Sequence, residues 1–567
     1  MAEKDSPPHK HINLTTTDDV DRVEAPVTSK AYMMCAFATF GGILYGYDSG
    51  YINGVSGSSL FIEAVEGQGA TALSSSHQSL IVSILSSGTL FGEFHNRSNV
   101  CHALTGHPSA GALIAGDLAD FFGRRSTVIF GCFIYIAGVV VQTATTVNNP
   151  TQALGLIVGG RLLAGFGVGQ LSATIIMYMS EICPRKVRGA LVSGYQFCIT
   201  VGILFASIVV YAAQSREDTG QYRIPIALQF VWGLILATGI FLLPESPRYF
   251  VKRGKVEKAR KSLATLRGQP ENSHLIKAEL REIIANAEYE RSFNHNESYL
   301  ASWANCFSGS FWEAKSNLRR TILGTSLQLM QQWTGVNFIF YYSTPFLKST
   351  NAISNTFLIS LIFTLINVLS TPVSFWAVEK FGRRPLLIWG ALGMLICQFS
   401  VAIIGDTVGF NHTHTVNGST VADNIAAVNA QIAFICIYIF FFASTWGPAA
   451  WVVVGEIFPI SIRSRGVGLS AASNWLSNTI IAVITPYMVG EDKGNLKSNV
   501  FFVWGSLCTS AFAFAYFLVP ETKGLTLEQV DRLFEETTPR TSSKWRPTTT
   551  YTAQMGGRDG HMEVESA

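Results

Sequence analysis

Apolar stretches long enough to cross a bilayer recur along the chain, and polar segments separate them. A spanning helix needs about 20 consecutive apolar residues, and a helix is the form in which one such segment satisfies its own backbone hydrogen bonds in lipid. We place spans near 31–55, 78–92 continued at 112–121, 126–147, 153–180, 190–212 and 224–243, then near 319–345, 353–378, 384–405, 428–455, 466–488 and 499–519. The pattern predicts an all-α membrane protein with twelve transmembrane helices in two six-helix bundles.

Polar segments set the boundaries of these bundles. We expect a cytoplasmic tail at 1–30, a first bundle at 31–243, a cytoplasmic helical loop at 244–318, a second bundle at 319–519 and a cytoplasmic tail at 520–567. Lys, Arg and Glu recur with helical spacing in the central loop, which predicts short amphipathic helices at the inner membrane surface. The polar, charged N-terminus is not typical of a cleaved signal peptide.

Basic residues fall on alternate connections between the spans, and the positive-inside rule places those connections and both termini in the cytoplasm. They include Arg124, Arg125, Arg185, Lys186, Arg188, Arg383, Arg384, Arg463 and Arg465. The loop 406–427 belongs to the opposite, external side and contains two Asn-X-Ser/Thr sequons, at Asn411 and Asn417. We therefore expect these two asparagines to be glycosylation sites.

Composition agrees with a membrane protein, because 48% of residues are hydrophobic and only 14% are charged. A soluble protein of this length needs more charged surface. The net charge of +3 gives no reason to expect a nucleic-acid partner. The 9 cysteines are scattered without zinc or disulfide-framework spacing, so we expect no metal and no cofactor.

One motif occurs near a cytoplasmic helix end in each half. The two copies are Gly116-Asp117-Leu118-Ala119-Asp120-Phe121-Phe122-Gly123-Arg124-Arg125 and Glu379-Lys380-Phe381-Gly382-Arg383-Arg384. A carboxylate followed by paired arginines suits a clasp between helix ends. The alternative is ordinary positive-inside charge, but recurrence in both halves favours the clasp.

An ordered set of further motifs resembles the sugar porters of the major facilitator superfamily, and most closely fungal hexose transporters of the high-affinity glucose type. The resemblance covers residues 31–535 and rests on Gly160-Arg161, Glu181-Ile-Cys-Pro184 with Arg188-Gly189, Pro244-Glu245-Ser246-Pro247-Arg248, Gln331-Gln332-Trp333-Thr334-Gly335-Val336-Asn337 with Tyr341-Tyr342, Trp446-Gly447-Pro448, Glu456-Ile-Phe-Pro459 and Pro520-Glu521-Thr522-Lys523-Gly524. It implies two bundles with a sugar site between them, in a monomer that moves a hexose such as glucose across the plasma membrane.

The resemblance also implies a gate of charged residues at the cytoplasmic helix ends. Its members are Asp120, Arg124, Arg125, Glu181, Arg188, Glu245, Glu379, Arg383, Arg384, Glu456 and Arg463. Phe121 departs from the family pattern, which has Arg or Lys at this position, and this loosens the expected clasp of the first half.

Amides within the spans are the expected sugar ligands, because a sugar needs groups that both donate and accept hydrogen bonds, together with an aromatic face. Gln328 and Gln331 lie one turn apart on one helix and so share a face. By resemblance, the residues facing the central site are Gln196, Gln328, Gln331, Gln332, Asn337, Asn367, Trp451 and Asn474. The alternative is that these amides only bond helix to helix.

Asp48 lies inside the first span, an energetically costly place for a carboxylate that indicates function. Arg161 lies in the fourth span and is a plausible counter-charge. The resemblance implies a role for Asp48, because proton-coupled sugar porters carry Asp at the matching position, whereas related passive facilitators commonly carry Asn. We expect Asp48 to pair with Arg161 when ionised and to release it when protonated. A buried ion pair that never titrates is the structural alternative.

The segment 93–111 interrupts the second span with charged residues, three histidines, Gly106 and Pro108, which oppose a membrane helix. Its flanks would otherwise join into one family-like helix. We hypothesise that the segment is absent from the working protein, as when an unspliced intron is translated, and comparing transcript with gene decides this. A functional loop and a zinc site from Cys101 and the histidines are the alternatives.

The leading interpretation is a proton-coupled hexose transporter, not an enzyme, that works by alternating access and whose partners are the sugar, protons and the lipid bilayer. Gly165-Phe-Gly167-Val-Gly169 lies in a membrane helix and serves close packing rather than phosphate binding. We find no nucleotide-binding motif and no nucleophile–base pair. Passive facilitation and a transporter-like sugar sensor are the alternatives.

Overall fold

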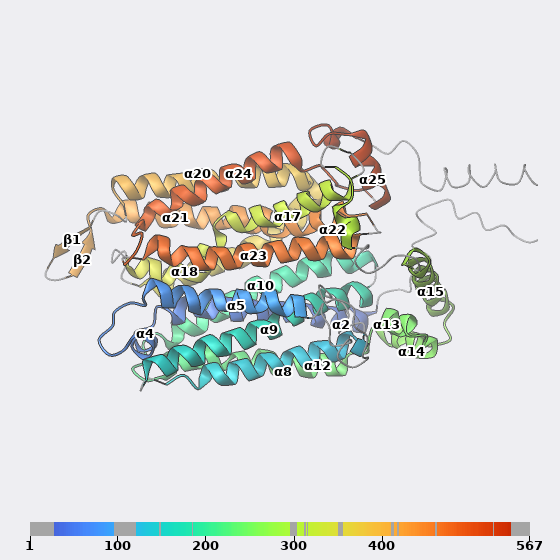
Figure 1. Ribbon diagram of the computed structural model, residues 1–567, viewed down its shortest axis with the longest axis horizontal. Coiled ribbons are helices and arrows are strands. Elements are labelled where there is room, and N and C mark those ends of the chain that lie inside the picture. The colour runs from blue at the N-terminus through green and yellow to red at the C-terminus, as the bar shows by residue number, and fades with distance from the viewer. Residues whose placement is uncertain are drawn as a thin grey trace, which may run out of the picture.

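The computed structural model describes residues 28–95, 121–146, 149–183, 185–294, 303–310, 313, 316–349, 355–409, 413–416, 419–459, 462–490, 492–525 and 527–545. Long helices lie side by side along the longest axis of the molecule (Figure 1). The first half contains α2 (Ser29–Thr39), α3 (Gly41–Val55), α4 (Ser59–Glu66), α5 (Ser75–His95), α8 (Arg124–Thr143), α9 (Pro150–Ile182), α10 (Arg185–Ala213), α11 (Gly220–Ala227) and α12 (Gln229–Leu242). The second half contains α17 (Asn317–Trp333), α18 (Val336–Ser349), α19 (Thr356–Phe381), α20 (Arg383–Thr407), α21 (Ile425–Phe441), η2 (Phe442–Trp446), α22 (Gly447–Ile457), α23 (Arg463–Val489) and α24 (Val500–Leu518).

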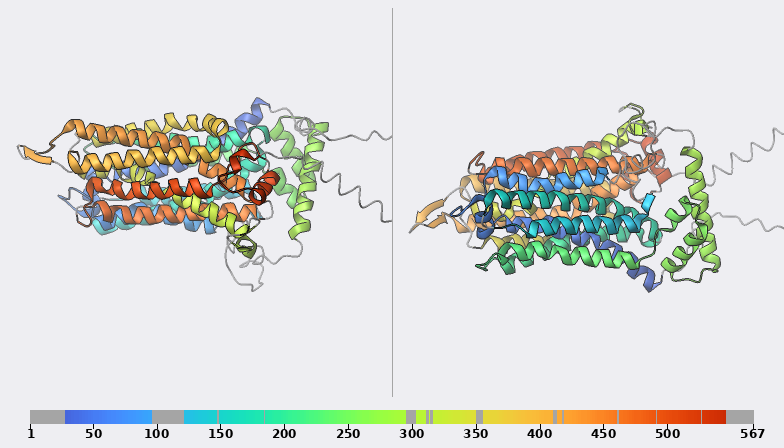
Figure 2. Two further views of the ribbon diagram at one scale, coloured as in Figure 1. Left: turned by 90° about the horizontal axis from the view of Figure 1, so that it is seen from above. Right: turned by 60° about the horizontal axis from the view of Figure 1, so that its bottom comes forward.

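The smaller elements gather at the two ends of this bundle (Figures 1 and 2). One end carries α13 (Pro247–Lys252), α14 (Val256–Arg267), α15 (His274–Asn294) and α25 (Leu527–Glu536), with the short helices η1 (Asn305–Phe307) and η4 (Ser542–Lys544) in the same connections. The opposite end carries α4, η3 (Lys497–Asn499), β1 (Thr413–Val416) and β2 (Ser419–Ala422). By the positive-inside rule we expect the first to be the cytoplasmic end, and we name the two ends cytoplasmic and external on that basis.

The helices confirm the predicted fold of twelve spans. Nine spans among the described residues are long and apolar enough to cross a membrane on length and composition alone. The first and seventh predicted spans are divided into α2 and α3 and into α17 and α18, and residues 112–121 of the predicted second span lie almost wholly outside the described residues. The prediction of an all-α protein missed one detail, because β1 and β2 form a short antiparallel hairpin in the loop 406–427. The β-branched Thr and Val residues of these segments favour strands there.

Two spans of the second half are broken near the middle of their length. Gly335 separates α17 from α18 with φ +86, a backbone conformation that glycine adopts without strain. The span 425–457 contains one π-helical turn, η2, between α21 and α22. Such irregular segments in membrane helices are tolerated where protein surrounds them, and they accompany functional sites.

Small residues let the helices of the first half approach closely. A Cβ on Gly165 would lie 2.4 Å from the Leu85 carbonyl oxygen of α5, and a Cβ on Gly167 would lie 2.7 Å from the backbone nitrogen of Tyr135 on α8. These contacts confirm the close-packing role predicted for the glycines after Arg161.

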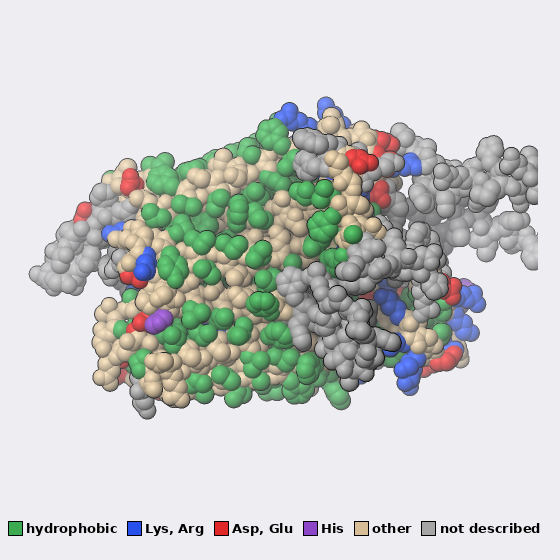
Figure 3. Space-filling view, viewed as in Figure 1, with side chains coloured by type: hydrophobic (Ala, Val, Ile, Leu, Met, Phe, Trp, Pro, Cys, Tyr) green, Lys and Arg blue, Asp and Glu red, His purple; other side chains and the backbone are tan. Residues whose placement is uncertain are grey.

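The outer surface of the bundle suits lipid. Figure 3 shows hydrophobic side chains spread over the middle of one face, with charged side chains at its two ends. Phe133 is 61% exposed and Trp389 is 67% exposed, values that a soluble protein would rarely tolerate for many large apolar residues. The chain is therefore a multi-pass membrane protein.

Candidate functional site

A cluster of amides occupies the middle of the second half, where α17, α18 and α23 meet. Asn474 Nδ2 donates to Gln328 Oε1 at 2.8 Å and to Gln331 Oε1 at 2.9 Å. Gln332 Nε2 donates to Gln331 Oε1 at 3.4 Å, and Asn337 Nδ2 donates to Gln332 Oε1. The structure thus brings five of the eight predicted sugar-site residues into one connected network of donors and acceptors.

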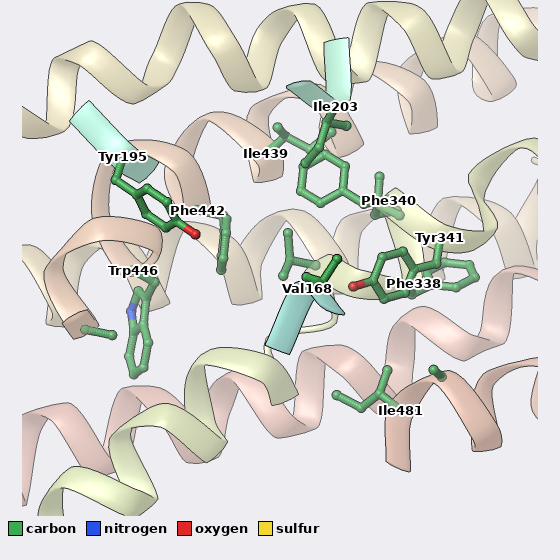
Figure 4. Packing of buried hydrophobic residues seen from close by; sticks show 14 of the residues in the cluster. Val168, Tyr195, Ile203, Phe338, Phe340, Tyr341, Ile439, Phe442, Trp446 and Ile481 are labelled. Carbon is green, nitrogen blue, oxygen red and sulfur yellow. The ribbon is translucent and has the colours of Figure 1, made fainter. Parts of the chain in front are cut away.

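The broken helix α21–η2–α22 holds this network in place. Gln331 Nε2 donates to the carbonyl oxygens of Trp446 at 3.1 Å and Gly447 at 2.8 Å, next to the π-helical turn. Trp446 is fully buried, and its indole donates to the Leu387 carbonyl at 2.8 Å. Figure 4 shows Trp446 and Phe442 in a buried cluster that also contains Tyr195 of α10. The three aromatic residues were absent from the predicted site, although Trp446 belongs to the family motif Trp446-Gly447-Pro448.

The other three predicted sugar-site residues lie outside the network. Asn367 is buried on α19, whereas Gln196 on α10 and Trp451 on α22 are half-buried. The α10 and α19 helices pack against each other across the two halves. Gln196 is the one predicted ligand from the first half. Within the network, Gln328 Nε2 is buried and has no partner among the described residues, so it is a donor suited to a bound hydroxyl.

Asp48 is fully buried on α3, and both its carboxylate oxygens lack a hydrogen-bond donor among the described residues. Arg161 is 1% exposed on α9. Its Nε donates to the Ile81 carbonyl at 2.7 Å, and its Nη1 donates to the Tyr51 hydroxyl at 2.6 Å. The structure therefore places both predicted proton-site residues in the interior of the first half, without a hydrogen bond between them.

Polar contacts join helix ends at the cytoplasmic end of the first half. We call the residues that make them the N-clasp: Arg124, Arg125, Glu181, Glu245 and Ser246. Glu245 accepts hydrogen bonds from the backbone nitrogens of Arg124 at 3.0 Å and Arg125 at 3.1 Å, so its carboxylate caps the N-terminus of α8. Arg124 Nη2 donates to Glu181 at 2.9 Å. Burial raises the pKa of Glu245, and backbone donors including Ser246 and Arg125 act against that rise.

The second half repeats this arrangement, and we call Arg383, Arg384, Glu456, Glu521 and Thr522 the C-clasp. Glu521 accepts from the backbone nitrogens of Arg383 at 3.0 Å and Arg384 at 3.1 Å and caps α20. Arg383 Nη2 donates to Glu456 at 2.7 Å, and Thr522 Oγ1 donates to Glu456 at 2.6 Å. A glycine with positive φ directly precedes the arginine pair of each clasp, Gly123 at +97 in the first half and Gly382 at +93 in the second.

The remaining gate residues are placed less uniformly. Glu379 is exposed, and the carboxylate that caps the second half is Glu521, which the predicted gate omitted. Arg463 Nη2 donates to the Gly455 carbonyl at 2.8 Å. Asp120, the side chain of Arg188, both sequons at Asn411 and Asn417, and most of the segment 93–111 lie outside the described residues.

Polar contacts join the two halves at the external end. Asn53 Nδ2 donates to Ser343 Oγ at 2.8 Å, and Asn53 Oδ1 accepts from the Thr344 backbone nitrogen at 2.9 Å. Asp492 accepts from the hydroxyl of Ser75 and from its backbone nitrogen at 3.3 Å, at the first residue of α5. The hydrogen bond from the Ser75 side chain lowers the pKa of Asp492. The external side of the bundle is therefore closed by hydrogen bonds.

No group of three or more His, Cys, Asp or Glu side chains arranged to hold a metal occurs among the residues that the structure describes.

Comparison with known proteins places this arrangement among transporters. The sequence model of the family described as "Sugar (and other) transporter" matches residues 99–534. The chain is 41% identical over 525 residues to the major facilitator-type transporter ecdD of Aspergillus rugulosus, which covers 91% of this chain and 90% of the relative. It is 36% identical over 512 residues to the high glucose sensor RGT2 of Saccharomyces cerevisiae, covering 90% of this chain and 61% of the relative. The probable glucose transporter rco-3 of Neurospora crassa is 37% identical over 530 residues, and hexose transporter 2 of Kluyveromyces lactis is 32% identical over 555 residues.

The fold is similar to that of a solved symporter. The proton:xylose symporter XylE bound to 6-bromo-6-deoxy-D-glucose matches with a TM-score of 0.67 and 26% sequence identity, and the match covers 89% of this chain and 99% of that one. XylE from E. coli in a partially occluded inward-open conformation matches with a TM-score of 0.66.

Proposed function

The chain belongs to the sugar transporter family of the major facilitator superfamily. On this premise we propose that it imports a hexose, with glucose as the first candidate, together with a proton across the plasma membrane. Transport proceeds by alternating access, in which the two halves rock about a central site. The sugar supplies the differential affinity that shifts the protein between its conformations.

The amide network supports sugar as the cargo. Five amide side chains on α17, α18 and α23 offer both donors and acceptors within a buried region, and the Nε2 donor of Gln328 has no partner among the described residues. A sugar ring presents many hydroxyls that need both kinds of partner. Trp446 lies beside the network, since Gln331 binds its carbonyl oxygen, and it offers the apolar surface that a sugar face requires.

The surroundings of Asp48 are the main observation in support of proton coupling. A carboxylate without a hydrogen-bond donor in a fully buried place is costly when ionised, so the neutral form is favoured in this conformation. Arg161 binds Tyr51, one helical turn from Asp48, and a cation close to a carboxylate favours its ionised form. A site balanced in this way binds and releases a proton as its surroundings change.

Uptake of labelled hexose in cells that lack their own hexose transporters tests this function. Proton coupling predicts accumulation above the external concentration, and a protonophore should abolish that accumulation. Uptake that reaches equilibrium and ignores the protonophore would indicate a passive facilitator. Absence of uptake of any hexose, with the protein present in the plasma membrane, would contradict transport.

A sugar sensor is the second candidate, because one relative of 36% identity is a high glucose sensor. The matched region covers 61% of that relative and 90% of this chain, so a large part of the sensor has no counterpart in the alignment. Hexose-dependent gene induction by this chain without hexose uptake would favour the sensor. Uptake without induction would favour the transporter.

A further inference from the structure

A chain of polar side chains runs through the interior of the first half, from α9 to α3 to α8. The hydroxyl of Tyr51 accepts a hydrogen bond from Arg161 Nη1 at 2.6 Å and donates one to Gln142 Oε1 at 2.5 Å. The guanidinium carbon of Arg161 also lies 5.4 Å from the centroid of the Tyr51 ring, within cation–π range. All three side chains are at most 1% exposed.

Tyr51 is therefore a specific partner of Arg161. Because Gln142 takes the proton of the hydroxyl, the oxygen lone pairs of Tyr51 are turned toward the guanidinium. Hydrogen bonds in such a chain strengthen one another in a low-dielectric interior. The second bond of Arg161, to the Ile81 carbonyl, fixes the opposite edge of its head group.

Asp48 lies one helical turn before Tyr51 on α3, so the two side chains share a face of that helix. The titratable and charged groups that interact electrostatically with Asp48 are Arg161 from α9, Tyr135 from α8 and the tyrosines Tyr45 and Tyr51 of its own helix. Arg161 is the cation of this set. One guanidinium thus has two candidate acceptors on one helix face, a phenol and a carboxylate.

We propose that Tyr51 is a positioning residue for proton coupling, because its hydroxyl competes with Asp48 for Arg161. With Asp48 protonated, Arg161 binds Tyr51, as in the structure. When Asp48 ionises, Arg161 moves from the phenol to the carboxylate, since a buried carboxylate needs a hydrogen-bonded cation. Breaking the Tyr51 bond opposes that ionisation, so Tyr51 sets the external pH at which the carrier loads its proton. The inference rests on the proposed role of Asp48 as the proton carrier.

The test is Tyr51→Phe, which keeps the aromatic ring and removes the competing hydroxyl. Hexose uptake is measured against external pH in transporter-deficient cells. We expect the pH of half-maximal uptake to move toward acid by about one unit, corresponding to about a tenfold change in proton affinity. Hexose affinity measured by counterflow without a proton gradient should stay within about twofold, because the amide network lies in the other half.

Tyr47→Phe is the matched control. Tyr47 lies on the same helix, is equally buried and donates its hydroxyl to the Pro225 carbonyl at 2.9 Å. Among the described residues, Arg161 has its hydrogen bonds with Ile81 and Tyr51 and its ring contact with Tyr51, and none with Tyr47. It should lose one buried hydrogen bond and leave the pH profile unchanged. A merely structural role of Tyr51 would make the two variants alike in pH profile and would overturn the proposal.

Two further variants separate the ways in which the test can fail. If Asp48→Asn leaves proton uptake unchanged, the proposed function fails and the competition fails with it. If Asp48→Asn uncouples transport but Tyr51→Phe keeps the wild-type pH profile, the competition alone is wrong. If Tyr51→Phe does not reach the membrane, Gln142→Met removes the acceptor that orients the phenol, and it should produce a smaller acid shift. A wild-type profile in Gln142→Met would then overturn the proposal.

Discussion

Gly123 and Gly382 occupy equivalent places in the two halves, and the residues around them repeat contact for contact. Each precedes a pair of arginines whose backbone nitrogens bind a carboxylate, Glu245 in one half and Glu521 in the other. The sequence predicted the arginines and Glu245 through their local motifs. Glu521 also stands in a family motif, Pro520 to Gly524, but it was not predicted as the cap, because its approach to α20 is a property of the packed fold.

Asp492 carries a prediction at the same scale, because it caps α5 from the opposite half. Asp492→Asn should weaken external closure. Ser79 is buried and faces the Val483 carbonyl across the halves, so a cysteine there reports on this closure. A membrane-impermeant thiol reagent should label Ser79→Cys several-fold faster when Asp492→Asn is also present. Asp218→Asn is the control, since Asp218 is an external carboxylate paired with Arg216 within one half.

The pH dependence of this contact follows from the pKa of Asp492, which Ser75 lowers. A carboxylate with a depressed pKa in the folded protein keeps its contact above the ordinary value and loses it only as pH falls through the depressed value. The ratio of mutant to wild-type labelling rates should therefore stay constant between about pH 7 and about pH 5. A ratio that falls to one near pH 5 would show that Asp492 is already protonated there.

At the scale of elements, the broken helices α17–α18 and α21–η2–α22 position the amide network. The Gln-rich stretch of α17 predicted polar side chains on one helix, and the structure connects them through Asn474, 143 residues away from Gln331. The network could be anticipated from residue type, whereas the π-helical turn that supports Gln331 could not. Phe442 to Trp446 contain no proline or glycine that would mark the turn itself, although Gly447 and Pro448 follow directly.

Gly335→Ala tests the break between α17 and α18. An added Cβ would have to tolerate φ +86 and would lie 2.8 Å from Cγ of Trp504. The left-handed backbone alone costs about 1–2 kcal/mol, and overpacking adds about 1–3 kcal/mol. The purified variant should therefore melt at a lower temperature than wild type. Gly159→Ala is the control, because space around that helical glycine is open, and an unchanged melting temperature for both variants would contradict the assigned strain.

At the scale of the whole molecule, twelve spans, the cytoplasmic helices and the family were all predictable, because membrane length, charge asymmetry and motif order are local properties of sequence. The conformation of the protein was not predictable from the sequence. Hydrogen bonds from Asn53 and Asp492 close the external side, and Arg161 is bound to Tyr51 rather than to Asp48. These contacts join segments distant in sequence, and they differ between the states of an alternating-access cycle.

The central claim is that Asp48 carries the transported proton, and sugar-induced alkalinisation of the medium tests it most directly. Addition of hexose to cells expressing the wild-type chain should raise external pH as protons enter with the sugar. In Asp48→Asn this alkalinisation should disappear, while counterflow of labelled hexose continues. Alkalinisation of wild-type size in Asp48→Asn, at equal hexose uptake, would contradict the account.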